Sequence, residues 1–214
     1  MFGVAPEKPE GTPVSYDTAQ QGFISRYNHV TYGLGFIITE EMIEDDLYDV
    51  IGERNARALA RSMRVTKETV GANVYNRAFS SSYLGGDGKS LLNSLHPNVA
   101  GGTWSNVLST AADLSEAALE QACIDIMKWE DDRGLPAQIM PKTLILPVDS
   151  VFEAERILKS NLRVDTANND LNALNSMGKF RDVVSNVYLT DPDAWFIPPK
   201  WCALPCKMPA ASPR

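Results

Sequence analysis

Two runs of carboxylates are the residues best suited to metal binding or acid–base chemistry. They are Glu44-Asp45-Asp46 and Glu130-Asp131-Asp132. Each run lies on or beside a stretch with a helical pattern, where consecutive side chains point in different directions. We therefore expect a solvated or salt-bridged surface in both places. A metal-dependent hydrolase that uses Asp45, Asp46, Asp131 or Asp132 is the least favoured alternative.

Two glycine-rich segments share only part of a nucleotide-binding pattern. Residues 85–90 read Gly-Gly-Asp-Gly-Lys-Ser, but Tyr83 stands where a phosphate-binding loop needs its first glycine. The segment also follows a predicted helix, whereas a phosphate-binding loop follows a strand. Gly33-Leu34-Gly35 lacks the third glycine of a dinucleotide fingerprint. We predict a flexible turn at 85–90 and a bend at 33–35.

The histidines and cysteines form no recognisable catalytic or metal-binding set. Cys202 and Cys206 supply at most half of a four-ligand zinc site, and Cys123 lies far away in sequence. His29 is also distant. His96 precedes a proline in a loop, where a hydrogen-bonding role is expected, and no nucleophile motif accompanies it. The sequence thus predicts no catalytic, cofactor-binding or metal-binding residue and no enzyme activity.

Composition narrows the class of protein further. The chain has 214 residues, 44% of them hydrophobic, which allows one or two domains. It has no run of eighteen apolar residues and no secretory signal pattern, so a soluble protein made in the cytoplasm, away from membranes, is predicted. The net charge of −7 and the lack of a Lys/Arg cluster disfavour sequence-specific nucleic-acid binding.

The N-terminal third predicts an arm, paired strands and a very long helix. Residues 1–13 are rich in proline and glycine, and 14–38 hold short β-prone pieces that predict a hairpin or extended loop resting on a neighbour. Residues 40–79 repeat apolar positions at helical spacing, with Thr39 as N-cap. Weak points are expected at Gly52, at Gly71 and at 65–66.

The rest of the chain predicts an α+β fold. Residues 80–112 form a long polar connection that is either functional or ordered by a partner. A helix follows at 114–131, capped by Asp113, buried along Leu119, Ala122, Ile126 and Trp129, and ended near Gly134. The last elements are a buried strand at 143–146, a helix from 149 or 150 with Phe152, Ile157 and Leu158 inward, and a strand at 183–189 that pairs with 194–197.

An ordered set of segments resembles the major capsid proteins of tailed phages and prophages. Residues 32–41 read Tyr-Gly-Leu-Gly-Phe-Ile-Ile-Thr-Glu-Glu, 58–64 read Ala-Leu-Ala-Arg-Ser-Met-Arg, and 93–102 read Asn-Ser-Leu-His-Pro-Asn-Val-Ala-Gly-Gly. Further matching segments lie at 42–48, 67–69, 76–79, 87–91, 112–119, 154–160, 173–177 and 188–191. The resemblance covers about residues 20–197.

The resemblance implies a capsid fold of the Hong Kong ninety-seven type. Residues 1–39 would be the N-terminal arm and extended β-loop, 40–111 the spine helix and connecting loop of the peripheral domain, and 112–197 mainly the axial domain. Residues 198–214 form an atypical proline-rich tail, for which we hypothesise a truncation or frameshift. The family usually has a longer N-terminal segment, so the chain is expected to start late.

The function implied is self-assembly into the icosahedral shell that encloses phage DNA. The partners would be copies of the same chain in hexamers and pentamers, with scaffold, portal or decoration proteins as further partners. The chain would reside in the virion, and in the host bacterial cytoplasm before assembly. An encapsulin-type shell protein of a bacterial compartment, which shares the fold, is the alternative.

Overall fold

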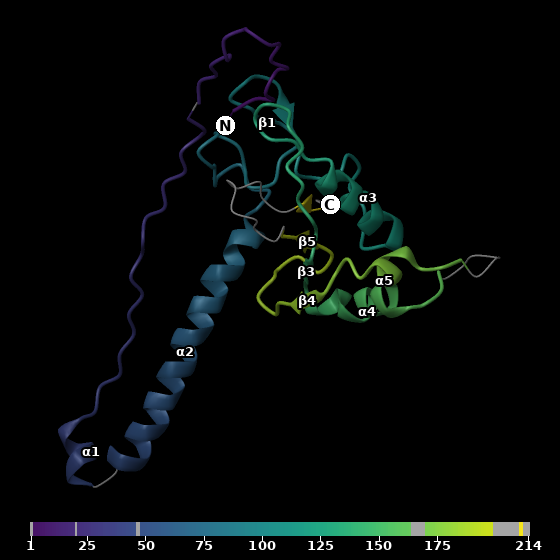
Figure 1. Cartoon of the computed structure of the whole chain (residues 1–214). Helices are drawn as coiled ribbons and strands as arrows, with labels where there is room; N and C mark the ends of the chain where they lie inside the picture. The colour runs from purple at the N-terminus through teal and green to yellow at the C-terminus, as the bar shows by residue number, and fades with distance from the viewer. Residues whose placement is uncertain (1, 20, 46–47, 164–169, 199–209, 212–214) are drawn as a thin grey trace.

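The computed structural model describes residues 2–19, 21–45, 48–163, 170–198 and 210–211 (Figure 1). Helices and strands are mixed along the chain, as the predicted α+β class requires. In chain order they are α1 (Glu40–Glu44), α2 (Tyr48–Asn76), β1 (His96–Pro97), β2 (Thr103–Trp104), α3 (Glu116–Met127), β3 (Thr143–Leu146), the 3-10 turn η1 (Val148–Ser150), α4 (Val151–Lys159), α5 (Ala173–Met177), β4 (Asp182–Ser185), β5 (Phe196–Ile197) and β6 (Ala210–Ala211).

A small mixed sheet organises the C-terminal half, which we call the body (residues 108–197). Its strand order is β4-β3-β5-β6, with β3 parallel to β4 and antiparallel to β5. The predicted pairing of 183–189 with 194–197 is therefore wrong, because β3 lies between them. The strand at 143–146 is confirmed, and its central place suits the Thr-Leu-Ile-Leu sequence, since Leu144 and Leu146 are fully buried.

Helix α3 covers one face of this sheet. Leu119, Ala122, Ile126 and Trp129 are buried in the main core, as predicted. The helix is shorter than the predicted 114–131. Its N-cap is Ser115, whose Oγ accepts a hydrogen bond from the Ala118 amide at 3.2 Å, in place of the predicted Asp113.

The turn after α3 also differs from the prediction. The helix ends at Met127, and the chain leaves it to form a bridge between Glu130 and Pro136. Gly134 has a φ of +78°, but it closes a turn from Asp131 in this bridge, so it does not terminate the helix.

Helix α4 packs on the same core through Ala154 and Leu158, which lie four residues apart on one face. Ile157 is partly buried against the core, but Phe152 is 78% exposed. The prediction that Phe152 faces inward is wrong, because the helix begins at Val151 and turns residue 152 away from the buried face.

The end of α2 joins the body on the other face of the sheet. Alternation along β5 places Ile197 in the main core and Phe196 in a second cluster with Ala78 and Leu92. The Tyr75 ring lies 5.0 Å from the Phe196 ring. In addition, the Asn76 side chain donates to a body carbonyl at 3.0 Å and accepts from a body amide at 3.1 Å. The last turn of α2 is therefore fixed to the body.

Most of α2 stands away from the body. The helix has 29 residues, about 44 Å of length, and Ala72 is its one buried residue among those described. The predicted helix over 40–79 is not continuous, because α1 ends at Glu44 with Asp45 as its C-cap, whereas α2 continues through Gly52, 65–66 and Gly71. The N-cap prediction for Thr39 is confirmed, because its Oγ accepts from the Met42 amide at 3.4 Å.

Residues 21–39 form an extended arm that runs back along α2 in the opposite direction (Figure 1). The arm and α2 meet at α1, at the end far from the body, and diverge towards the body. We call residues 21–76 the projection. The arm contains no strand in the described part of the chain, so the predicted hairpin is not formed, and it runs through 33–35 without the predicted bend. A strand needs a backbone partner, and the single chain supplies none.

The C-terminal tail is described only at β6, which pairs with β5 through Phe196 and Ala211 and through Ile197 and Ala210. The other tail residues, 199–209 and 212–214, lie outside the described residues, as do Cys202 and Cys206.

Candidate interaction site

The arm exposes a dense row of large apolar side chains. Ile37 is 87% exposed, and all the others between residues 23 and 38 are more than a third exposed. A single folded protein rarely leaves so many apolar groups in contact with water. They are Phe23, Ile24, Tyr27, Val30, Tyr32, Leu34, Phe36, Ile37 and Ile38.

The arm also leaves its backbone unpaired. Among the described residues, the segment 21–38 takes part in no backbone–backbone hydrogen bond. An extended segment with free amide and carbonyl groups is a template for pairing with another chain. Side chains and backbone thus both favour a partner along the arm.

One turn of the connection 80–112 fixes where the arm begins. The Gly86 amide donates a hydrogen bond to the Ser25 Oγ at 3.1 Å. A Cβ at Gly86 would lie only 2.3 Å from the Ile24 carbonyl oxygen, so no side chain fits there. The turn itself is closed by the Gly85 amide and the Lys89 carbonyl oxygen at 2.7 Å. The turn predicted at 85–90 is confirmed, and it serves as a seat for the arm.

A second anchor holds the segment before the arm. Asp17 forms an ion pair with Arg133, and the Arg133 guanidinium also donates to the Thr18 carbonyl at 2.7 Å. The Gly3 amide donates to Asp17 at 2.8 Å. The Gly3 amide first, and the Arg133 side chain second, lower the pKa of the Asp17 carboxyl below its ordinary value.

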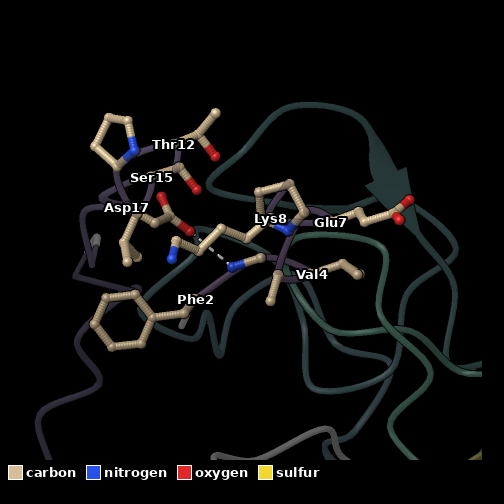
Figure 2. A pocket seen from close by; sticks show the side chains of 12 residues that line it. Phe2, Val4, Glu7, Lys8, Thr12, Ser15 and Asp17 are labelled. Carbon is tan, nitrogen blue, oxygen red and sulfur yellow. Dashed lines mark hydrogen bonds between the residues drawn. The ribbon is translucent and has the colours of Figure 1, made fainter. Parts of the chain in front are cut away.

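This closure shapes an open hollow of about 340 Å³ at the N-terminus (Figure 2). Among the described residues, its walls come from residues 2–8, 12–15 and 17. Figure 2 shows the Asp17 carboxylate facing the backbone nitrogen that donates to it, with Phe2 and Val4 on the rim and Glu7 turned outward. The polar groups serve the loop's own closure, and they do not converge on a point where a substrate would bind.

The connection 80–112 is ordered by contacts within the chain. His96 is buried, its Nδ1 lies 2.5 Å from the Asp87 carboxylate, and its ring stacks on Trp104 at 4.7 Å. The predicted hydrogen-bonding role of His96 is confirmed. Asn106 bridges the strands of the loop by bonding the Asn93 amide and the Leu91 carbonyl, both at 2.8 Å. The loop thus needs no partner for its order.

Burial raises the pKa of the Asp87 carboxyl, but hydrogen bonds from His96 and from the Lys89 amide outweigh this effect. The pKa of Asp87 therefore lies below its ordinary value. The His96 Nε2 has no hydrogen-bond partner among the described residues. The geometry of the pair is that of a structural contact inside the loop.

Within the two carboxylate runs, Asp131 has a structural role. Asp131 Oδ1 accepts from the amides of Arg133 and Leu135 at 2.8 and 2.9 Å, which closes the turn after α3. Asp45 is the C-cap of α1, and Asp46 lies outside the described residues. In the described part of the chain, no three His, Cys, Asp or Glu residues are grouped closely enough to hold a metal ion.

The cysteine that is described is Cys123, which is buried and free. Burial raises the pKa of its thiol to about 11. The thiol therefore stays protonated at neutral pH and packs as a small apolar group. No described helix combines the length and hydrophobicity that crossing a bilayer requires.

Together, these features define a class: a structural subunit whose body has its own buried core and whose projection exposes apolar side chains. The sequence matches the family described as phage capsid protein over residues 24–201, and the chain belongs to this family. It is therefore a structural capsid subunit, a component of the virion. No curated protein and no solved structure shows significant similarity to it. Sequence inspection found the arm and the helix but missed Gly86 and Arg133, since both act through contacts distant in sequence.

Proposed function

We propose that the chain is the major head subunit of a tailed phage or prophage, and that its copies form hexamers and pentamers that close into an icosahedral shell around DNA. One observation carries this proposal: the projection holds a row of exposed apolar groups and a 29-residue helix with one described buried residue. Neighbouring copies would cover both. Scaffold, portal and decoration proteins are further partners of such a shell.

The division of the chain suits a subunit of the Hong Kong ninety-seven type. Residues 1–39 would act as arm and extended loop, and 40–111 as spine helix with its connection. Residues 112–197 would form mainly the axial domain, whose main core supports contacts around the capsomer axis. The tail, 198–214, adds β6 to the sheet edge.

The energetics of such a shell depend on repetition. Burying one large apolar side chain contributes about 1.5–3 kcal/mol, and the arm offers several. Each contact between two copies is modest, but every copy makes it, and linked contacts reinforce one another. A closed container follows from many weak and identical interfaces.

The test uses the full chain and two matched variants. Sedimentation and electron microscopy of the purified protein should show closed, hollow particles. Ile37→Ser removes an apolar group of the arm and should abolish the particles while the monomer keeps its circular dichroism spectrum. Val187→Ser alters a similarly exposed valine, 75% exposed, outside the projection and should leave the particles unchanged. A wild-type chain that stays monomeric at every concentration, or an Ile37→Ser variant that assembles normally, would contradict the proposal.

A further inference from the structure

Charges are segregated along the projection. Residues 40–52 carry six acidic side chains and no basic one, whereas 54–67 carry five basic side chains and no acidic one. We call the described members of the first group the acidic tip: Glu40, Glu41, Glu44, Asp45 and Asp49. We call the second group the basic stripe: Arg54, Arg57, Arg61, Arg64 and Lys67.

The basic stripe occupies one side of α2. At the helical repeat of about 100° per residue, its five members fall within a sector of about 140°. They span about 20 Å along the axis and are all exposed. Neutral residues separate them in the sequence, so the chain has no linear Lys/Arg cluster. The helix gathers them on one face, where Glu53 and Glu68 lie at the two ends of the stripe.

Very little of this charge is neutralised within the chain. Arg57 pairs with Glu53 at 2.5 Å, but their side chains are 78% and 66% exposed, so water screens this pair. Among the described residues, the other four members of the stripe have no ion pair, and neither has any member of the acidic tip. Four members of the tip lie on α1 or at its C-cap, and Asp49 lies in the first turn of α2, so the tip precedes the stripe along the projection.

Helix chemistry accounts for only part of the acidic tip. Glu40 and Glu41 occupy the first turn of α1, where negative charge is favourable. Glu44 and Asp45 lie at the other end of α1, where negative charge is unfavourable, so they do not serve the helix. The tip also exposes Ile43 and Val50, which are 55% and 75% accessible. Apolar groups beside like charges are typical of a surface that a partner covers.

We propose that the acidic tip of one copy docks on the basic stripe of α2 in a second copy. The inference rests on the proposed function, which supplies neighbouring copies. The occupant is argued from charge complementarity, since every copy carries both halves of the contact. Such a head-to-tail contact closes into rings when repeated by rotation. Nucleic acid is the less favoured occupant of the stripe, because the chain as a whole has a net charge of −7.

The test reverses the charge of the stripe and of the tip separately, and then of both together. The stripe variant is Arg61→Glu with Arg64→Glu, and the tip variant is Glu44→Lys with Asp45→Lys. Either should raise the protein concentration needed for assembly by at least about tenfold, because like charges then face each other. The combined four-residue variant restores opposite signs and should assemble within about threefold of the wild type. Arg181→Glu, which reverses a single charge at an exposed position outside the projection, should have no effect.

Several outcomes separate this inference from the proposed function. Shells that form equally well from the wild type and both single-half variants would overturn the docking contact and leave the function standing. Small oligomers that dissociate at about 0.5 M salt, without shells, would support the contact and overturn the shell, because exposed charges are screened at that salt. A stripe variant that assembles normally but loses binding to a fluorescent DNA duplex would assign the stripe to nucleic acid and overturn the contact. A wild type that stays monomeric at low salt would overturn both.

Discussion

The body buries many of its large apolar side chains, whereas the projection leaves most of its own exposed. In the body, Leu119, Ile126 and Leu144 are fully buried between the helices and the sheet. In the described part of the projection, Ala72 is the one buried residue, although the arm alone carries nine large apolar side chains. Both regions belong to one chain of ordinary composition. The difference teaches that hydrophobic content does not decide burial, and it supports the proposal that neighbouring copies cover the projection.

The two regions also differ in what keeps their backbone ordered. Sheet pairing and packing hold the body, whereas α2 depends on its own helical hydrogen bonds and on the few contacts at its last turn. In proteins, most of the stability of a helix comes from tertiary packing of its apolar face, which α2 has mainly at its last turn. The projection is therefore expected to gain order on assembly, and the body is expected to keep its order throughout. The following variants test this division.

The largest effect is expected in the main core. Leu144→Ala removes a fully buried side chain at the centre of the sheet and should lower the free energy of unfolding by about 2–5 kcal/mol. The matched variant Leu34→Ala, in the arm, should change it by less than about 0.5 kcal/mol, because that side chain is exposed in the monomer. Urea unfolding followed by tryptophan fluorescence measures both. Equal losses of unfolding free energy in the two variants would contradict the contrast between a buried body and an exposed arm.

A smaller effect is expected in the connection between the two regions. Asp87→Ala leaves the buried His96 without its partner and should cost about 1–3 kcal/mol at neutral pH. The same change at Asp45, in the projection, should leave the urea midpoint unchanged.

The contribution of Asp87 should depend on pH in a defined direction. Because the pKa of Asp87 is lowered in the folded chain, its contribution is complete above the ordinary aspartate pKa, near about 4, and is lost as pH falls through the lower folded value. The difference between wild type and Asp87→Ala should therefore shrink in acid. A difference that grows in acid would show that the carboxylate is not the stabilising form.

Local patterns predicted the elements, and distant contacts decided their arrangement. The short apolar run at 143–146 and the helical spacing of Leu119, Ala122 and Ile126 identified β3 and the buried face of α3. The pairing of β5 with β3 was not predictable, because a short strand carries no signal for its partner. Phe152 was misplaced because the starting residue of a helix sets its inward face, and that start shifted by one or two residues.

The candidate site was predictable in outline only. An overlong helix and an arm rich in exposed aromatic and aliphatic residues indicated a subunit that needs neighbours. The seat at Gly86 was not predictable, because its reason is the close approach of Ile24, sixty-two residues earlier in the sequence. The end of α1 at its C-cap Asp45 was not predicted either, since the apolar spacing continues past this residue. Contacts of this kind become visible only when the chain is folded.

A change at the arm's seat should affect the boundary between the two regions more than either region. Gly86→Ala places a Cβ against the Ile24 carbonyl, so the arm must move away from the turn. In the wild type the Gly86 amide donates to Ser25. We expect the backbone amide at position 86 to exchange faster in the variant than in the wild type, and the global stability to change by less than about 1 kcal/mol. Gly22→Ala, which has open space around it, is the matched control. Unchanged exchange at Gly86 would show that the turn does not hold the arm.

The smallest effect is expected inside α2. Gly71 is exposed, and a Cβ there meets nothing within 4 Å, so Gly71→Ala should stabilise the helix by about 0.5–1 kcal/mol through propensity alone. Because α2 contacts the body mainly at its last turn, the gain should stay local: amide exchange along α2 should slow several-fold while the urea midpoint of the body stays the same. If the protection of the α2 amides and the urea midpoint of the body rose together, helix and body would unfold as one unit. The partner-dependent region would then be the arm alone.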